Sequence, residues 1–192
     1  MQVESPPATG TPAQELLRRI AGGDRDALAT LYHQHQRALF RYLCGLIPDR
    51  GLAEEALQDT LLAVWRSAGS FQGRSALRTW LFGIARRQAH NALRRRGLPV
   101  VDAEDLLALA DPAQGTEDQA LQRAELGELA GAIRRLSLVH REVLALTFVS
   151  GLSYEEIAGV LDVPEGTVKS RLSNARRALR RAVEERDGDT NR

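Results

Sequence analysis

One stretch, residues 151–177, constrains the fold of this chain more than any other, because it encodes two short helices around a sharp break. Ser153, followed three residues later by Glu156, forms a capping box, so a helix should begin near Tyr154. Pro164 separates this helix from the next, because proline disfavours a helical residue before it and suits a first helical turn. The pattern predicts a helix-turn-helix.

The second helix of this motif has two different sides. Its apolar stripe, at helical spacing, consists of Val168, Leu172, Ala175 and Leu179. The opposite side combines polar side chains that can read base edges with cations that can bind phosphates; it holds Thr167, Ser170, Asn174, Arg177 and Arg181, flanked by Lys169, Arg171, Arg176 and Arg180. The alternative is an ordinary solvated face, but Glu165 is the only acid between Val163 and Val183.

Charge is segregated along the 192 residues, although the net charge is only +1. The segment between Thr60 and Val101 has no acid, and its arginines are Arg66, Arg74, Arg78, Arg86, Arg87, Arg94, Arg95 and Arg96. Acids then dominate residues 102–128, where Arg123 is the only base. Alternating blocks of charge indicate separate working surfaces, and the basic blocks indicate a polyanionic partner.

Helical periodicity without strand alternation predicts an all-α fold of two small helical domains joined by a flexible linker. Caps are expected at Asp24, Ser75 and Ser137. The expected helices cover about 13–21, 25–47, 52–67, 76–96, 120–136 and 138–149. The expected organisation is a disordered N-terminus at 1–14, a first domain at 15–97, a linker at 98–124, a second domain at 125–186 and a fraying tail at 187–192.

The helix expected over residues 52–67 leaves an outer strip that mixes acids with one apolar side chain. Its members are Glu55, Gln58, Asp59, Leu62 and Arg66. A single exposed leucine is common and needs no explanation. An acidic strip with an apolar centre equally suits docking of a basic partner.

The next helix carries a basic stripe of Gly83, Arg86 or Arg87, His90 and Arg94. It follows the loop GSFQGRS, which contains Phe71 and Arg74. Cations beside an exposed aromatic ring suit single-stranded nucleic acid, whose bases stack on rings. The alternative is that Phe71 and Trp80 are core residues and the arginines are merely solvated; the core is favoured for Trp80, and both readings stay open for Phe71.

Several classes of function are not expected. The single cysteine, Cys44, excludes an internal disulfide and a cysteine-rich zinc site, and it lies on an apolar stretch where burial is expected. His33 and His35 are two residues apart on a helix and face different ways, so no metal or other cofactor is expected. The sequence contains no recognisable nucleophile–base pair, so an enzyme is not expected. No apolar run or signal peptide indicates membrane insertion or export, so a cytoplasmic protein is expected.

Three stretches together resemble an extracytoplasmic-function (ECF) sigma factor of the bacterial sigma-70 family. They are AEEALQDTLLAVW at 53–65, SFQGRSALRTWLFGIARR at 70–87 and GLSYEEIAGVLDVPEGTVKSRL at 151–172. The resemblance implies a two-domain subunit, with regions two and four, that binds RNA polymerase core and promoter DNA. It also allows for an anti-sigma partner.

The resemblance assigns roles to matching positions. Glu55, Gln58 and Asp59 match residues that grip a coiled coil of the largest polymerase subunit. Phe71 and its loop match the segment that receives a flipped base of the −10 element. The matches to the helix that reads the −35 element are Lys169, Ser170, Arg171, Ser173 and Asn174.

Three positions depart from the family's usual residues. Arg87 stands where asparagine is frequent, Asn91 where aspartate is frequent, and Asn174 where arginine is frequent. These departures concern the promoter sequence rather than the class. A helix-turn-helix regulator that does not engage core polymerase is the alternative function, and it would need no acidic docking strip. An RNA-binding or antitermination protein that uses the arginine-rich helix is a third hypothesis.

Overall fold

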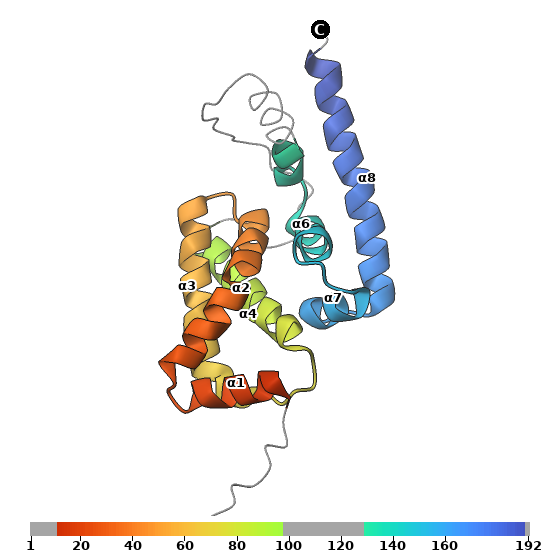
Figure 1. The fold of residues 1–192 in the computed structure, drawn as a ribbon. Helices are drawn as coiled ribbons and strands as arrows, with labels where there is room; N and C mark the ends of the chain where they lie inside the picture. Colours follow the sequence, from red (N-terminus) through yellow and green to blue (C-terminus); the bar gives the residue numbers. More distant parts are fainter. Residues whose placement is uncertain (1–10, 98–128, 191–192) are drawn as a thin grey trace, which may run out of the picture.

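This computed structural model describes residues 11–97 and 129–190, and within them it contains helices and no strands, which confirms the all-α expectation. The helices form two groups (Figure 1). The first group consists of α1 (Pro12–Ala21), α2 (Arg25–Leu46), α3 (Arg50–Ser67), a 3₁₀ turn (Ala68–Ser70) and α4 (Leu77–Arg95). The second consists of α6 (Leu138–Leu144), a π-helical turn (Ala145–Val149), α7 (Tyr154–Leu161) and α8 (Glu165–Thr190). The expected linker lies outside the described residues.

Side-chain caps set the first three helix starts. Thr11 forms a capping box with Gln14 at the start of α1. The Asp24 carboxylate caps α2 as expected, since it accepts hydrogen bonds from two backbone amides at 3.0 Å. Asp49 accepts a bond from the Leu52 amide at 2.8 Å, so α3 begins two residues earlier than its apolar pattern suggested.

The expected cap of α4 at Ser75 is wrong. The Ala76 carbonyl accepts the first helical bond, from the Trp80 amide at 3.2 Å, so Ala76 occupies the cap position and makes no side-chain bond there. The preceding loop turns at Gly73, whose φ of +69° favours glycine. This turn places Ser75 one residue too early to cap the helix.

Helix α4 is central to the first group, because α2, α3 and α7 all pack against it. Its buried residues include Leu81, Ile84 and Ala92. They also include Phe82, whose ring meets the buried Tyr42 ring edge-on with centroids 5.3 Å apart. A single-stripe pattern misses Phe82 because this helix is covered on more than one side.

The helix-turn-helix forms as its sequence predicts. Ser153 and Glu156 make both bonds of the capping box at the start of α7. Asp162 then adopts a left-handed backbone with φ of 56°, and the Pro164 carbonyl accepts the first bonds of α8. Helix α8 continues to Thr190, through the residues after Glu185 that were expected to fray, and no proline interrupts it.

The two groups pack directly on each other, with α7 against α4 and the α6–π-turn segment against α2. Small residues allow this close approach. A Cβ added at Gly45 of α2 would lie 3.3 Å from the Ala145 Cβ, and one added at Gly159 of α7 would lie 3.1 Å from the Thr79 methyl group. Buried apolar side chains from both groups therefore form one continuous cluster.

Candidate functional site

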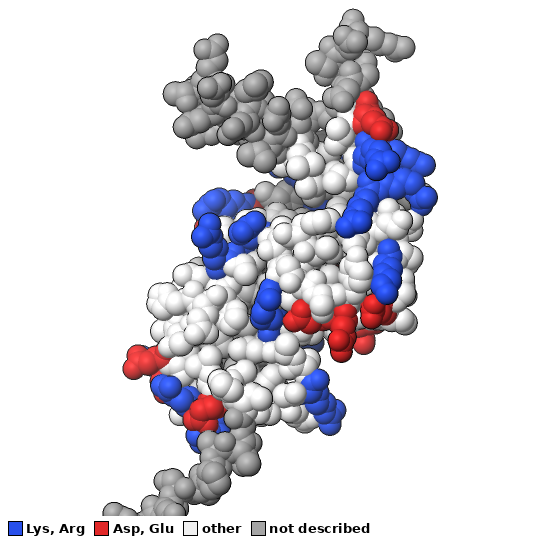
Figure 2. Space-filling view, turned by 45° about the vertical axis from the view of Figure 1, so that its right-hand side comes forward, with Lys and Arg blue, Asp and Glu red and all other residues white. Residues whose placement is uncertain are grey.

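The outer face of α8 is available to solvent. Val168, Leu172 and Ala175 are buried, which confirms the predicted apolar stripe. Most of the polar and basic side chains on the opposite side are exposed: Lys169, Ser170, Ser173, Asn174, Arg177 and Arg181. Thr167 and Arg171 are half-buried. Figure 2 shows basic side chains gathered over α8. This face has the shape and chemistry of a major-groove reader.

The polar side chains of α8 make only local contacts. The Lys169 ammonium lies 2.7 Å from the Glu165 carboxylate, and this hydrogen bond raises the pKa of Lys169. The Lys169 ammonium also lies 5.7 Å from the Tyr154 ring centroid. Arg177 donates to the Asn174 side-chain oxygen at 2.6 Å. Exposed pairs of this kind contribute little stability and can exchange for DNA contacts.

Arg176 does not flank this face as expected. Its guanidinium lies over the Phe148 ring, 5.4 Å from the centroid, and both side chains line a groove of about 730 Å³. Phe148 is 62% exposed, and apolar walls of the groove come from Leu129, Ile133, Leu144, Leu179 and Val183. The groove is a second exposed surface of this group of helices, separate from the polar face of α8.

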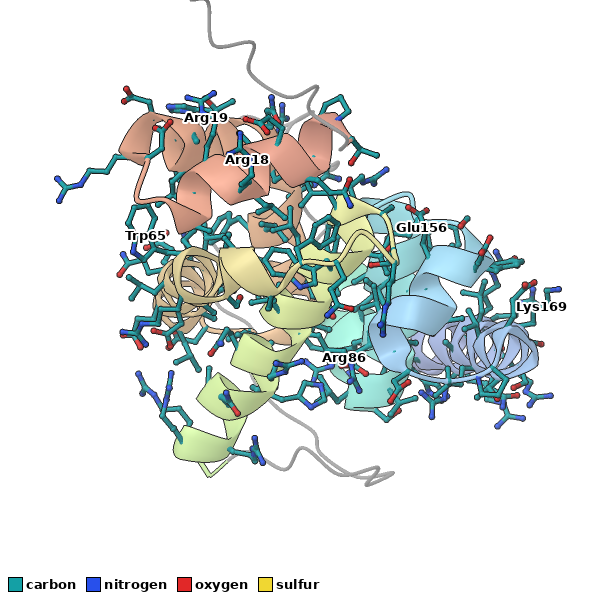
Figure 3. The ribbon with its side chains drawn as sticks, turned by 90° about the horizontal axis from the view of Figure 1, so that it is seen from below. Arg18, Arg19, Trp65, Arg86, Glu156 and Lys169 are labelled. Atoms are coloured by element: carbon teal, nitrogen blue, oxygen red, sulfur yellow. The ribbon has the colours of Figure 1, made fainter. Side chains whose placement is uncertain are left out.

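The basic stripe of α4 is in a different situation, because two of its members contact the second group. Arg86 Nε donates to Glu142 Oε1 at 2.9 Å, and Arg86 Nη2 lies 3.4 Å from Oε2. His90 Nε2 hydrogen-bonds to the same Oε1. The Glu142 side chain is only 1% exposed. Figure 3 shows Arg86 between α4 and the second group, whereas Lys169 lies on the outer side of α8.

The other cations of this stripe remain accessible. Arg74 and Arg87 are exposed, and Arg94 donates to the Asn91 side chain at 2.6 Å. A cleft of about 740 Å³ between α4 and α7 brings the expected stripe together; its lining includes Gly83, Arg86, Arg87, His90, Arg94 and Asp162. The structure thus brings the stripe together, but the Glu142 carboxylate already binds two of its members, Arg86 and His90.

Phe71 is half-buried and packs against Trp80, with ring centroids 5.4 Å apart. Trp80 is half-buried as well and rests on the core. The Phe71 ring therefore has one side on Trp80 and one part open to solvent. This geometry combines both interpretations of Phe71, since a ring fixed by a neighbour can still receive a base.

The strip on α3 lies on the solvent side of the first group. Glu55 and Gln58 are exposed, and Leu62 is 52% exposed. Asp59 lies 3.1 Å from Arg95 of α4, so this acid has an internal partner. A hollow of about 440 Å³ between α2 and α3 lies beside the strip and is lined by Tyr32, Arg37, Phe40, Leu57 and Gln58.

Glu142 is the important residue that the sequence interpretation missed. A signal was present, because Glu142 lies on the apolar stripe of its helix between Leu138 and Ala145. A carboxylate at a buried position requires a cationic partner. Arg86 and His90, which the pattern placed on a solvent-exposed stripe, supply that partner.

One single-residue expectation, the burial of Cys44, is wrong, and His35 has a distinct environment. Cys44 is exposed rather than buried, because it lies on the α2 side toward Arg50 and Glu54; partial burial still raises the pKa of its thiol. His35 is half-buried, and burial together with nearby Arg78 lowers its pKa. In the part of the chain that the structure describes, no set of three ligating side chains could hold a metal, and no helix could span a bilayer.

Comparison with known proteins gives the family. Residues 31–98 match Sigma-70 region 2, and residues 126–179 match Sigma-70 region 4. The chain is 32% identical over 182 residues to the RNA polymerase sigma-H factor of Pseudomonas aeruginosa, covering 89% of this chain and 93% of that protein. It is 34% identical over 167 residues to the ECF RNA polymerase sigma factor SigL of Mycobacterium tuberculosis, covering 86% and 93%.

Two solved structures also resemble this chain. A sigma factor RpoE in complex with the anti-sigma factor NepR from Bartonella quintana is 31% identical, with a TM-score of 0.61 and coverage of 81% of this chain and 97% of that one. CnrH, solved in complex with the cytosolic domain of CnrY, shares the fold, with 23% identity, a TM-score of 0.67 and coverage of 90% and 97%. These matches span both groups of helices and favour the sigma-factor interpretation over a regulator that does not engage polymerase. The chain belongs to the ECF group of RNA polymerase sigma factors, which bind core polymerase and promoter DNA to initiate transcription.

Proposed function

We propose that this sigma factor divides its tasks among three surfaces. The outer strip of α3 binds core polymerase, α4 with the Phe71 loop takes the melted −10 strand, and α8 reads the −35 element. No catalytic activity of its own is assigned to it, and it works in the cytoplasm. One observation carries the proposal: an acidic strip on α3 and a polar, cationic face on α8 are both exposed on different groups of helices in one chain.

The α8 surface supports its role through both position and chemistry. Ser170 and Asn174 lie one turn apart on the exposed side, so they face the same groove. Asparagine has a donor and an acceptor on one planar group, which suits the major-groove edge of adenine. Lys169 and Arg177 beside them suit phosphates, which fix the register.

The α4 surface suits a single strand. Arg74, Arg87 and Arg94 are exposed cations near the half-buried Phe71 ring. Cations that follow a backbone beside a ring that stacks a base are the usual elements of single-strand binding. Arg86 and His90 complete this surface once their contact with Glu142 is released.

The α3 strip suits a basic or amphipathic helix of the polymerase. Leu62 provides an apolar centre, and Glu55 provides an exposed charge that forms no ion pair with the other described residues. Charged rims of this kind increase the association rate and select the partner. Asp59, in contrast, already contacts Arg95 and would have to exchange partners on binding.

The decisive experiment replaces Glu55 by arginine. Glu55→Arg should abolish retention by core RNA polymerase in a pull-down and should change the free energy of unfolding by no more than about 0.5 kcal/mol, because the side chain is exposed. Glu155→Arg, the same charge change on the exposed side of α7, is the matched control and should bind core normally. Normal retention of Glu55→Arg would contradict the assignment of the strip.

An anti-sigma protein is a second partner that we infer. The support is the Bartonella quintana relative, which was solved in complex with an anti-sigma factor, together with the apolar groove beside Phe148. A two-hybrid screen with the source genome should yield a binder that is lost with Phe148→Asp and kept with Asn174→Asp, an exposed change on the side of α8 that faces away from the groove. A binder equally sensitive to both changes would argue against the groove.

A further inference from the structure

The loop between α3 and α4 has a fixed shape but no hydrogen bonds of its own in its second half. Among the described residues, positions 72–75 take part in no hydrogen bond. Gly73 nevertheless has a left-handed backbone, with φ of +69°, and Phe71 in the same loop rests on Trp80. Ordering a backbone costs conformational entropy, so a neighbouring element has to stabilise this conformation.

Helix α1 is that neighbouring element. Its Leu17 and Ile20 are each 1% exposed, so the helix is anchored in the core of the first group. It packs against the 3₁₀ turn that opens the loop, and a Cβ added at Gly69 would lie 3.6 Å from the Ala21 Cβ. Figure 1 shows α1 across the end of the first group, beside the segment that joins α3 to α4. The start of the loop therefore lies on the last turn of α1.

A second contact joins the first turn of α1 to the middle of the loop. A Cβ added at Gly73 would overlap the Gln14 side-chain nitrogen and lie 3.0 Å from the Gln14 Cδ, so this amide packs directly on the glycine. The capping box orients the amide, because its oxygen accepts a hydrogen bond from the Thr11 backbone at 2.8 Å. With the oxygen fixed by Thr11, the nitrogen points toward Gly73.

The two contacts with α1 lie on either side of Phe71. Gly69 precedes Phe71 by two residues, and Gly73 follows it by two. The Phe71 ring itself rests on Trp80, with centroids 5.4 Å apart. Helix α1 therefore supports the backbone that carries the ring, and Trp80 supports the ring. A loop that is ordered before DNA arrives loses less conformational freedom when a base stacks on it, which favours binding.

We propose that α1 is a positioning element for promoter opening, with Gln14 as the positioning residue that holds Phe71 ready for a flipped base. In this role Gln14 touches the loop rather than the DNA, so it acts through Phe71. The helix lies outside residues 31–98, which match Sigma-70 region 2. The inference rests on the proposed role of the Phe71 loop at the −10 element, and it adds the element that gives this loop its shape.

The size of the effect depends on the fraction of molecules whose loop is correctly placed. If loss of the Gln14 contact leaves about a tenth of the loops in this conformation, the apparent rate of base capture falls about tenfold. The loss should not exceed that of Phe71→Ala, because Gln14 acts through the ring. A premelted template should restore most of the rate, since an unpaired base is easier to capture.

Promoter opening by the holoenzyme, followed by 2-aminopurine fluorescence in the −10 element, tests the contact from the side of α1. Gln14→Ala should slow opening of duplex DNA about tenfold. Gln14→Ala combined with Phe71→Ala should be no slower than Phe71→Ala alone, because the two residues act in one unit. Thr11→Ala is the matched control, since it weakens the same capping box and leaves the Gln14 side chain on the loop. It should open the promoter at the wild-type rate.

Substitution of Gly73 tests the same contact from the loop. Gly73→Asn keeps a left-handed backbone accessible but places a side chain where Gln14 lies, so it should slow opening as Gln14→Ala does. Gly97→Asn is the control, since Gly97 has nearly the same φ, +67°, and a Cβ there would meet no atom of the described residues within 4 Å. This control should open the promoter normally. Gly73→Asn leaves the capping box intact, so its effect does not depend on the stability of α1.

The variants separate failure of this inference from failure of the proposed function. Wild-type opening by Phe71→Ala would overturn both. Slow opening by Phe71→Ala beside wild-type opening by Gln14→Ala or Gly73→Asn would overturn the positioning role alone. Losses that add in the double variant, or an equal loss in Thr11→Ala, would show that α1 affects opening through its own stability rather than through the loop, and would also overturn the positioning role.

Discussion

The two arginine-rich helices, α4 and α8, have similar side chains but different partners. On α4, Arg86 and His90 meet Glu142, Arg78 meets the Ser150 carbonyl and Arg95 meets Asp59, all far away in the sequence. On α8, the Lys169–Glu165 ion pair and the Arg177–Asn174 hydrogen bond join residues four and three positions apart. A basic composition alone therefore does not tell whether a surface is available to a nucleic acid.

The cause of the difference is position in the fold. Helix α4 lies between α2, α3 and α7, whereas α8 lies at the edge of the molecule and projects away from the first group (Figure 1). A cation on a central helix meets other protein groups and is recruited by them. A cation on an edge helix meets water, and its weak local pairs can be replaced by phosphates at little cost.

The largest expected effect compares one arginine from each helix. Arg86→Ala should lower the free energy of unfolding by about 3 kcal/mol, because it removes a main partner of a buried carboxylate. Arg177→Ala should change it by no more than about 0.5 kcal/mol, because its hydrogen-bond partner, Asn174, is exposed. Urea unfolding monitored by circular dichroism gives both values. Equal losses would remove the distinction between the two helices.

Base reading by α8 is the next largest effect. Asn174→Arg should shift the preferred base at one position of the −35 element by about 1–3 kcal/mol, since arginine favours guanine where asparagine favours adenine. Selection of upstream elements from a randomised pool by the two holoenzymes measures the shift. Identical selected sequences would mean that Asn174 reads no base and that α8 binds only the backbone.

Phe71 offers a test on the α4 side. Phe71→Ala should raise the free-energy barrier to promoter opening by about 1–3 kcal/mol, the contribution of one stacked base. A premelted template should restore the rate. The control is Gln72→Ala, an exposed change in the same loop. Equal defects on duplex and premelted templates would identify Phe71 as a packing partner of Trp80 and nothing more.

The smallest effect concerns salt. Lys169→Ala should reduce the slope of log affinity against log salt by about one for −35 duplex DNA, as loss of one phosphate contact does. Arg86→Ala should leave the slope unchanged in the free protein, because this guanidinium is already bound to Glu142. A salt titration by fluorescence anisotropy compares them. A similar change in both variants would show that Arg86 also contacts the DNA in the free protein.

Local chemistry was readable from the sequence wherever neighbouring residues decide the structure. The Ser153–Glu156 capping box, the Asp24 cap and the Val168–Leu172 stripe all form, since each depends on residues within about two turns. The Ser75 cap failed because a turn at Gly73 shifted the helix start. Burial of Cys44 failed because periodicity on a long helix does not show which side a neighbour covers.

The residues of the candidate surfaces were also predictable only where local spacing, rather than packing of distant segments, decides their exposure. Exposure of Leu62 and Asn174 followed from spacing, because no distant segment covers them. The fate of Arg86 and His90 could not follow from spacing, since Glu142 lies more than fifty positions away and reaches them only through the packing of the two groups. A buried acid on an apolar stripe signals that a cation is needed, but not which cation supplies it.

The continuity of α8 has a mechanical consequence. Its 26 residues form a rod about 39 Å long, without a proline to bend it. The residues proposed to face DNA lie in its first half, and the groove beside Phe148 follows with Leu179 and Val183. A partner that binds the groove at Val183 and tilts the rod by about 10° would displace Thr167, about 24 Å away along the axis, by about 4 Å, roughly one base-pair step. If the proposed roles hold, we expect α8 to act as a lever, so that docking in the groove changes the register of the proposed DNA-reading residues on the promoter.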